Sequence, residues 1–418
     1  MKFIVILFFF IFTIQSLIAQ NAAENDTLRK DAVKLFIDCV RCDMNHIRRE
    51  IPYVNYVRDV KEAELYLMET RESTGSGGSQ YTYFFIGQKK YEGLNDTLIY
   101  SSRPDDTREH QRQGRTDMMK MGLMRYVART PIYREVNIVH SGNIEEEEVS
   151  DKWNHWVFEV ETRPRFESEE SRKEFSFDNS FMANRITPEW KVEFRVNHEL
   201  NRTKYLYEEE THIKERTEIE LDNLVVKSLS EHWSVGNRLS LLTSTFSNME
   251  FNATILPSVE YNIYPYSEST HRQLRFLYGI GPSINYYNDT TIYNKISENL
   301  WRHQLQIAYQ IQEKWGSINI SLEGSNYFND FSKYRIELEG NLNIRIIKGL
   351  SLSIRGNIAQ IHDQLSLVKG DLAEADILLQ LQELATAYSV DGGIGLTYTF
   401  GSIFNNVVNP RFGNRRRF

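Results

Sequence analysis

The chain has 418 residues, of which 41% are hydrophobic, and its formal net charge is −8 at pH 7. This length exceeds one average domain, and the mildly acidic balance argues against a nucleic-acid partner, which requires a basic face. Aromatic residues are abundant, with 23 Phe and 23 Tyr against only 9 Pro. Such a balance favours a chain rich in β-strands.

Residues 1–19 have the pattern of a secretory signal peptide. Lys2 supplies a positive charge, residues 3–14 form a short apolar core, and a cleavage site is predicted before Gln20. The core falls short of the ~20 apolar residues of a spanning helix, which disfavours an N-terminal membrane anchor. Because no later stretch reaches ~18 uninterrupted apolar residues, a membrane location would have to depend on strands.

Residues 20–142 are predicted to form a small α/β domain. Strands are expected over 34–38, 64–71, 80–87, 97–101 and 135–140, and helices over about 43–51 and 108–128. A Gly/Ser-rich hairpin tip joins the second strand to the third. Helices beside a few mixed strands make one α/β unit, and the acidic stretch 143–152 is predicted to be a solvated linker.

One stretch and one helix of this domain carry a family resemblance. Residues 62–67, Glu-Ala-Glu-Leu-Tyr-Leu, run into the hairpin, and the helix over 108–128 follows late in the domain. In this order the domain resembles the small α/β domain of the curli-secretion lipoprotein and the N-terminal domain of the Tol translocation protein. The resemblance covers under a third of the chain. It implies a periplasmic protein partner or envelope scaffolding rather than catalysis.

Cys39 and Cys42 are the only cysteines, and they lie where a strand gives way to a helix. In an oxidising compartment the favoured interpretation is a structural disulfide. A redox pair stays open, because Cys-x-x-Cys at a helix start lowers a thiol pKa, although Asp38 and Asp43 flank the pair with negative charge. A metal site is the third alternative, with His46 nearby, but two cysteines alone do not complete a zinc site. No metal or other cofactor is predicted.

From residue 153 to residue 402, apolar and polar side chains alternate along about twelve segments. The clearest is 334–346, Tyr-Arg-Ile-Glu-Leu-Glu-Gly-Asn-Leu-Asn-Ile-Arg-Ile. A period of 2 held this long predicts a strand with one apolar and one polar face, which at roughly 3.3 Å per residue can cross a bilayer at a tilt. Short turns are expected at one end of the strands and longer polar loops, such as 205–215, 288–299 and 364–386, at the other.

This asymmetry is typical of outer-membrane barrels, whereas a soluble sandwich, the alternative, has no reason for it. We therefore predict an α+β periplasmic domain followed by an antiparallel transmembrane β-barrel of about 12 strands and a basic tail over 403–418. Trp190, Trp233 and Trp315 fall at short-turn ends, where an aromatic girdle is expected. The segment 393–400 resembles the terminal strand that barrel-insertion machinery recognises, although further residues follow it.

These features are similar to those of Gram-negative outer-membrane β-barrel proteins, and they imply outer-membrane lipid and the insertion machinery as partners. With the apolar side chains on lipid, the alternate charged residues would line the lumen. The predicted lumen-lining charges are Arg163, Lys191, Glu193, Arg195, Glu218, Glu220, Asp222, Arg275, Arg302, Glu323, Arg335, Glu337, Glu339, Arg345 and Arg355. They would form a network of ion pairs across a narrow lumen, since buried charges need partners, or a constriction that selects a small polar or ionic solute.

The turn near Lys348 also predicts how its two flanking strands pair. Ile346 should lie opposite Leu350, which places Arg355 beside Asn341. A tight turn therefore sets the register of this hairpin along its whole length.

An enzyme is the alternative from another class, because some barrels of this size are lipid hydrolases or proteases. His198 and His303 face lipid by parity, but neither has a Ser two residues away on the same face. His362 and Asp363 resemble the pairing of outer-membrane proteases without a companion acid pair. The sequence thus predicts a non-enzymatic outer-membrane protein whose barrel anchors a periplasmic interaction domain, with passage of a small polar solute as a further role.

Overall fold

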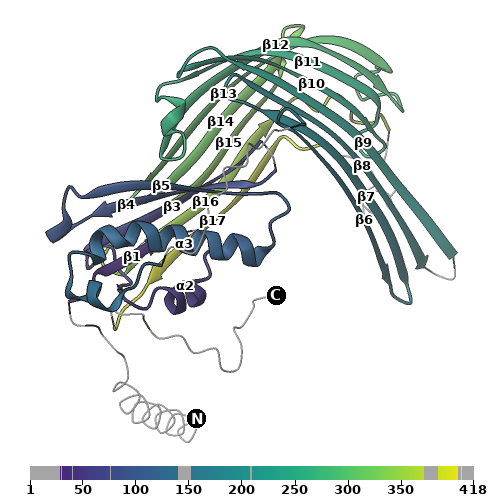
Figure 1. The fold of residues 1–418 in the computed structure, drawn as a ribbon. Helices are drawn as coiled ribbons and strands as arrows, with labels where there is room; N and C mark the ends of the chain where they lie inside the picture. The colour runs from purple at the N-terminus through teal and green to yellow at the C-terminus, as the bar shows by residue number, and fades with distance from the viewer. Residues whose placement is uncertain are drawn as a thin grey trace, which may run out of the picture.

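The structure is a computed structural model that describes residues 29, 31–39, 41–75, 77–139, 152–207, 210–370, 385–402 and 406. The predicted signal peptide, nearly all of the acidic linker and most of the basic tail lie outside these residues. The described chain forms a small α/β domain and a 12-stranded antiparallel sheet, called the large sheet below (Figure 1). No helix in the described part of the chain is long and apolar enough to cross a membrane.

The α/β domain is built on a mixed sheet with the strand order β2-β1-β3-β4-β5. β1 (Lys34–Asp38) lies parallel to both β2 (Asn55–Tyr56) and β3 (Leu65–Ser73). β3, β4 (Ser79–Gly87) and β5 (Asn95–Ser102) form an antiparallel meander. These strands lie close to the predicted ranges, except for β2, which is too short to have an alternating pattern of its own.

Two helices pack on this sheet, and their bounds agree with the prediction. α2 (Met44–Glu50) begins after Asp43, whose side chain accepts a hydrogen bond from the backbone N–H of His46. α3 (Arg108–Val127) lies along the sheet (Figure 1). Gly122 allows this close approach, because a Cβ atom there would lie 2.1 Å from Cζ of Phe85. The core between helix and sheet includes Leu123, which is fully buried.

The strand predicted over 135–140 is wrong for the described residues. Residues 131–135 form a short 3₁₀ helix, η3 (Pro131–Glu135), and 136–139 have no regular structure. The side chains of Ile138 and Val139 are 83% and 80% exposed. β-branched residues favour a strand only where a neighbouring strand pairs with them, and these residues join neither edge of the domain's sheet.

In the large sheet, each strand pairs with its neighbours along the chain, and the predicted count of about twelve antiparallel strands is confirmed. The strands are β6 (Trp156–Ser168), β7 (Arg172–Ile186), β8 (Trp190–Tyr207), β9 (Glu210–Ser228), β10 (Trp233–Ser244), β11 (Met249–Asn262), β12 (Arg272–Tyr287), β13 (Ser297–Glu313), β14 (Gly316–Tyr327), β15 (Asp330–Ile347), β16 (Leu350–Ile361) and β17 (Tyr388–Tyr398). The sheet is strongly curved (Figure 1).

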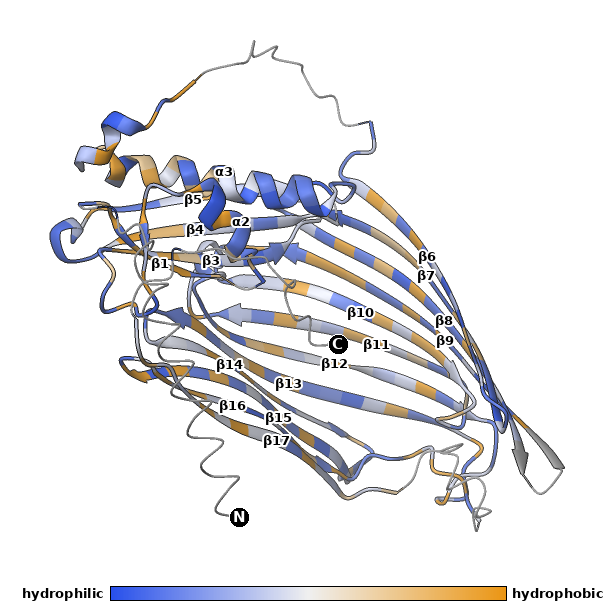
Figure 2. Cartoon of the chain, turned by 90° about the horizontal axis from the view of Figure 1, so that it is seen from below, coloured by the Kyte–Doolittle hydropathy of each residue, from blue (hydrophilic) through white to orange (hydrophobic). Residues whose placement is uncertain are grey.

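The two edge strands of the large sheet, β6 and β17, are not paired with each other in the described residues. Figures 1 and 2 show these edges apart. Their apolar side chains are correspondingly open, with Val160 75% and Ile394 78% exposed. The structure therefore contains a curved antiparallel sheet with two free edges among the described residues.

The connections differ in part from the prediction. In the described part of 205–215, strands take the place of the expected loop, because β8 and β9 continue until Tyr207 pairs with Glu210. Polar residues are compatible with a strand here, since β8 and β9 pair with each other beyond the ends of their outer neighbours β7 and β10. At the opposite end the turn near Tyr266 is longer than expected, with residues 263–271 containing η4 (Tyr266–Glu268). The long connection over 288–296 agrees with the prediction, and so do the described residues 362–370 and 385–387 between β16 and β17, whereas residues 371–384 lie outside the described chain.

Candidate functional site

The register of the large sheet decides which of the predicted charges share a face. Residues directly opposite each other in an antiparallel pair point to the same side. Such pairs include Arg195 with Asp222, Gly279 with Gln304, and Glu323 with Glu337. When the pairs are followed from β6 to β17, all of the charges that the sequence assigned to a lumen lie on one face, the polar face.

The register predicted around Lys348 is correct for most of its length, because Asn341 lies opposite Arg355. Next to the turn the predicted register is wrong by one residue. Ile347 rather than Ile346 pairs with Leu350, through an irregularity after Arg345. The irregularity changes only the last pair, so the rest of β15 and β16 keeps the predicted assignment of faces.

The opposite face, the apolar face, carries the large hydrophobic side chains. Many of them are open, including Ile219, Ile336 and Leu338, which are 43%, 46% and 40% exposed. Figure 2 shows the hydrophobic and hydrophilic residues alternating along the strands. Exposed apolar surface that extends over many strands is not normal for a protein face in water and indicates a contact with lipid or with another protein.

Several charges on the polar face have local partners. Lys191 Nζ lies 3.1 Å from Glu193 Oε1 on the same strand, and Arg335 Nε lies 3.1 Å from Asp363 Oδ1. Asn357 donates a hydrogen bond to Glu337 at 3.1 Å. Among the described residues no ion pair joins two strands of the large sheet that are not neighbours. These contacts do not form the predicted network across a lumen.

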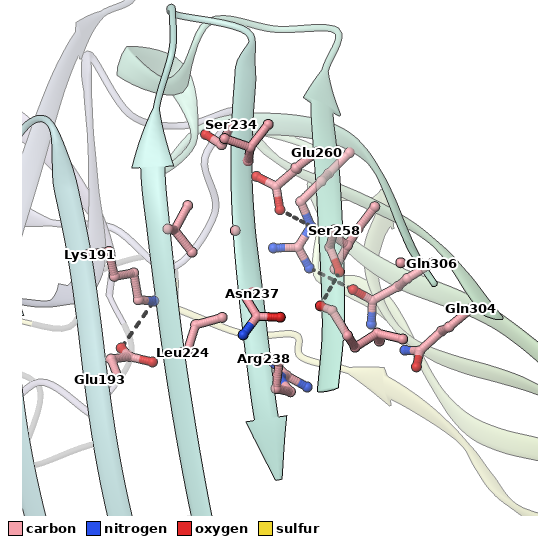
Figure 3. A pocket seen from close by; sticks show the side chains of 17 residues that line it. Lys191, Glu193, Leu224, Ser234, Asn237, Arg238, Ser258, Glu260, Gln304 and Gln306 are labelled. Carbon is pink, nitrogen blue, oxygen red and sulfur yellow. Dashed lines mark hydrogen bonds and ion pairs between the residues drawn. The ribbon is translucent and has the colours of Figure 1, made fainter. Parts of the chain in front are cut away.

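A pocket of ≈ 340 Å³ opens on the polar face where β8 to β13 approach their short turns (Figure 3). Arg275 donates a hydrogen bond to Gln306 at 3.0 Å, and its Nε lies 3.7 Å from Glu260 Oε2. Glu260 also accepts a 2.6 Å hydrogen bond from the hydroxyl of Tyr266. Arg238 lines the same pocket and has no charged partner in the described chain. The pocket thus offers donors, acceptors and both signs of charge to a small polar solute.

The α/β domain lies at the short-turn end of the large sheet (Figures 1 and 2). Its β3–β4 hairpin reaches the turns that follow β7 and β11. At Gly75 an added Cβ would lie 2.2 Å from Cβ of Ile186, so the two backbones are nearly in contact. Ser269 Oγ donates to Glu72 at 3.4 Å, and the ring of Phe84 lies 6.1 Å from that of His271.

Three acidic residues of the domain, Asp38, Asp59 and Glu62, hold the β15–β16 end of the large sheet, and we call them the acidic contact set. Arg345 Nη2 lies 2.8 Å from Asp38 Oδ2, and the guanidinium also lies over the ring of Phe36. Asp59 accepts a 2.8 Å hydrogen bond from the backbone N–H of Gly349.

Glu62, the third member, forms an ion pair with Lys348. The hydrogen bond from Lys348 holds the pKa of the Glu62 carboxyl below its usual range. Arg345, which the sequence assigned to a lumen, lies on the polar face by register and also contacts the domain. The acidic contact set was missed because its partners lie far away in the sequence and no local pattern marks them.

Inside the domain a buried ion pair lies beside the cysteines. Arg115 contacts both carboxylate oxygens of Glu69, at 2.5 and 3.1 Å, and its guanidinium stacks 4.6 Å from the ring of Tyr81. Burial raises the pKa of Glu69 even though Arg115 pairs with it. Cys39 and Cys42 are joined in a disulfide. No group of His, Cys, Asp and Glu among the described residues could hold a metal ion.

The histidines considered for catalysis have other neighbours. His198 lies 3.2 Å from the amide nitrogen of Asn179, and the ring of His303 stacks on Phe328 at 4.5 Å. In the residues that the structure describes, neither makes a hydrogen bond to a Ser hydroxyl. Asp363, next to His362, is paired with Arg335. These contacts do not assemble a nucleophile with a base.

No protein-family model, curated protein or solved structure matches the chain. The resemblances to outer-membrane barrels and to the curli and Tol domains therefore gain no support from a relative.

Proposed function

We propose that the protein is a Gram-negative outer-membrane β-barrel protein whose own periplasmic α/β domain caps the short-turn end of the barrel. One observation carries this proposal: the strand register puts the predicted lumen charges on one face, and the opposite face exposes large apolar side chains. Exposed apolar area costs roughly 25 cal/mol per Å² in water and nothing comparable in hydrocarbon. A bilayer is the environment that suits this face.

Closure of the large sheet follows from the same premise. Unpaired backbone groups at a strand edge are too costly to expose to lipid, so a sheet can span a bilayer only as a closed barrel. With an even number of strands, β6 and β17 run antiparallel, and the pairings put Trp156 and Tyr398 at the same, short-turn end. Pairing between these edges would complete an up-and-down barrel.

The contacts of the α/β domain support a capped rather than an open barrel. The β3–β4 hairpin meets the turns after β7 and β11, and the acidic contact set meets the turn after β15. A polar solute in the ≈ 340 Å³ pocket would therefore lie next to the domain. In this proposal the barrel anchors the domain, a periplasmic protein is its partner, and a solute passes only when the domain moves.

Refolding into lipid vesicles tests the proposal. The full-length protein should float with phosphatidylcholine vesicles. It should also resist unfolding by SDS until it is heated, because a closed barrel has no unpaired edge strand at which unfolding can begin. Its conductance in planar bilayers should be low and should rise in the Asp38→Asn/Asp59→Asn/Glu62→Gln variant. A chain that is freely soluble without detergent and stays out of the vesicles would contradict the membrane assignment.

A further inference from the structure

A second cavity, which we call the interdomain cavity, separates the α/β domain from the short turns of the large sheet. Its volume is ≈ 400 Å³. Residues 58–61 of the domain line one side, and residues 314–315 and 345–347 line the other. We propose that the interdomain cavity binds a phosphate group, either as a phospholipid headgroup or as free phosphate.

Three cations that line the cavity, Arg58, Lys61 and Lys314, have no acidic partner in the described part of the chain. The guanidinium of Arg58 makes a single hydrogen bond, from Nη1 to the carbonyl oxygen of Phe400 at 3.4 Å. Its Nε is buried and has no hydrogen-bond partner among the described residues. Because a buried charged donor without a partner is costly, an anion bound here would be stabilised.

The acid that lines the cavity is already engaged. Asp59 accepts hydrogen bonds from the backbone N–H groups of Lys61 and Gly349, at 2.9 and 2.8 Å. The remaining cation, Arg345, is balanced by Asp38. The cavity therefore keeps an excess of positive charge. Three of its cations have no acidic partner among the described residues, whereas in the pocket on the polar face only Arg238 has none there, and Lys191 and Arg275 each have an acidic neighbour.

The rim of the cavity is apolar and would suit the acyl chains of a phospholipid whose phosphate lies inside. Trp315, Ile346 and Ile347 line it and are 42%, 49% and 56% exposed. Trp at the short-turn rim suits the level of lipid headgroups, and basic pockets at that level bind anionic ones. The lipid source rests on the membrane location proposed above, whereas binding of free phosphate does not.

The test uses full-length protein in detergent, with three probes: dioleoyl-phosphatidylglycerol, dioleoyl-phosphatidylcholine and inorganic phosphate. Native mass spectrometry measures lipid retention, and calorimetry measures phosphate binding. The wild type should retain phosphatidylglycerol in preference to phosphatidylcholine, whose choline is a cation. Lys61→Gln and Lys314→Gln should each weaken binding about fivefold, since a lysine near an anionic headgroup contributes about 1 kcal/mol.

A matched control removes two lysines that lie outside the cavity and are both exposed. The Lys295→Gln/Lys369→Gln variant, with both changes in the long connections at the opposite end of the large sheet, should bind as the wild type does. Phosphate binding without lipid retention, lost in Lys61→Gln/Lys314→Gln, would support a free-phosphate site even if the membrane proposal failed. Equal retention of both lipids together with no phosphate binding, or unchanged binding in the Lys61→Gln/Lys314→Gln variant, would overturn the inference.

Discussion

The α/β domain and the large sheet place their apolar side chains in opposite ways. Leu67, Phe85 and Met119 of the domain are fully buried, whereas Val160 and Ile336 of the large sheet are 75% and 46% exposed. Both regions contain alternating strands, so the pattern alone does not separate them. The difference is that helix α3 covers the domain's sheet, and no element covers the apolar face of the large sheet in the described residues. The domain therefore shields its apolar side chains from solvent by its own fold, whereas the described part of the large sheet leaves them exposed.

The largest expected effect lies in the buried interior of the domain. Arg115→Met leaves the carboxylate of Glu69 buried without its partner, and breaking such a pair typically costs about 3–5 kcal/mol. A denaturant titration in which proteolysis of the domain reports the unfolded fraction measures the loss in free energy of unfolding. Arg103→Met, which removes an exposed arginine, should change it by less than about 0.5 kcal/mol. Equal effects of the two substitutions would mean that the Arg115–Glu69 contact contributes no more to the free energy of unfolding than an exposed arginine does.

The apolar face of the large sheet provides a test of similar size. Leu338→Arg puts a charge at the middle of β15, and in lipid this should destabilise the folded protein by about 2–4 kcal/mol. Asn319→Arg, on the polar face of the neighbouring strand and opposite the neutral residues Gln310 and Asn341, is the control and should be nearly neutral. Urea titration of vesicle-refolded protein measures both. If Leu338→Arg also proved neutral, the face would be in contact with water and the comparison of the two regions would fail.

Two glycines compare how tightly the domain and the large sheet are packed, with smaller expected effects. Gly122→Ala would push a methyl group to 2.1 Å from the ring of Phe85, whereas Gly324 on β14 has no atom within 4 Å of the position of an added Cβ. We expect Gly122→Ala to cost about 1–3 kcal/mol through overpacking. Gly324→Ala should change the free energy of unfolding by less than about 0.5 kcal/mol. Thermal unfolding of both variants under the same conditions decides, and a larger effect at Gly324 would contradict the packing described here.

The smallest effect concerns acid and the contact between the two regions. Lys348 lowers the pKa of Glu62 in the docked state, so docking favours the ionised carboxylate. The contribution of Glu62 is therefore full above about pH 5 and is lost as the pH falls through the lowered pKa. Conductance should rise on acidification in the wild type. In Glu62→Gln it should be higher at pH 7 and should depend less on pH. An identical pH profile in both proteins would exclude Glu62 as a contributor.

The sequence predicted the strands well because each face of a strand meets a single environment. Residues 334–346 lie within β15, and the expected neighbours Asn341 and Arg355 pair. It failed where partners decide the structure. Ile138 and Val139 suggested a strand but have no edge to join. The docking of the domain was not predictable at all, because Asp38 and Arg345 are separated by 307 positions and no local pattern connects them.

The most direct test of the central claim is a disulfide between the edge strands. In a Cys39→Ser/Cys42→Ser background, Val160→Cys is combined in turn with Val390→Cys, Ile394→Cys or Tyr398→Cys, all on the apolar face by register. Leu338→Cys with Ile358→Cys, which lie opposite each other, is the positive control. If the barrel is closed, one edge combination should cross-link in vesicle-refolded protein as fully as the control. Cross-linking of the control with none at the edges would show that β6 and β17 stay apart and that the large sheet is not a barrel.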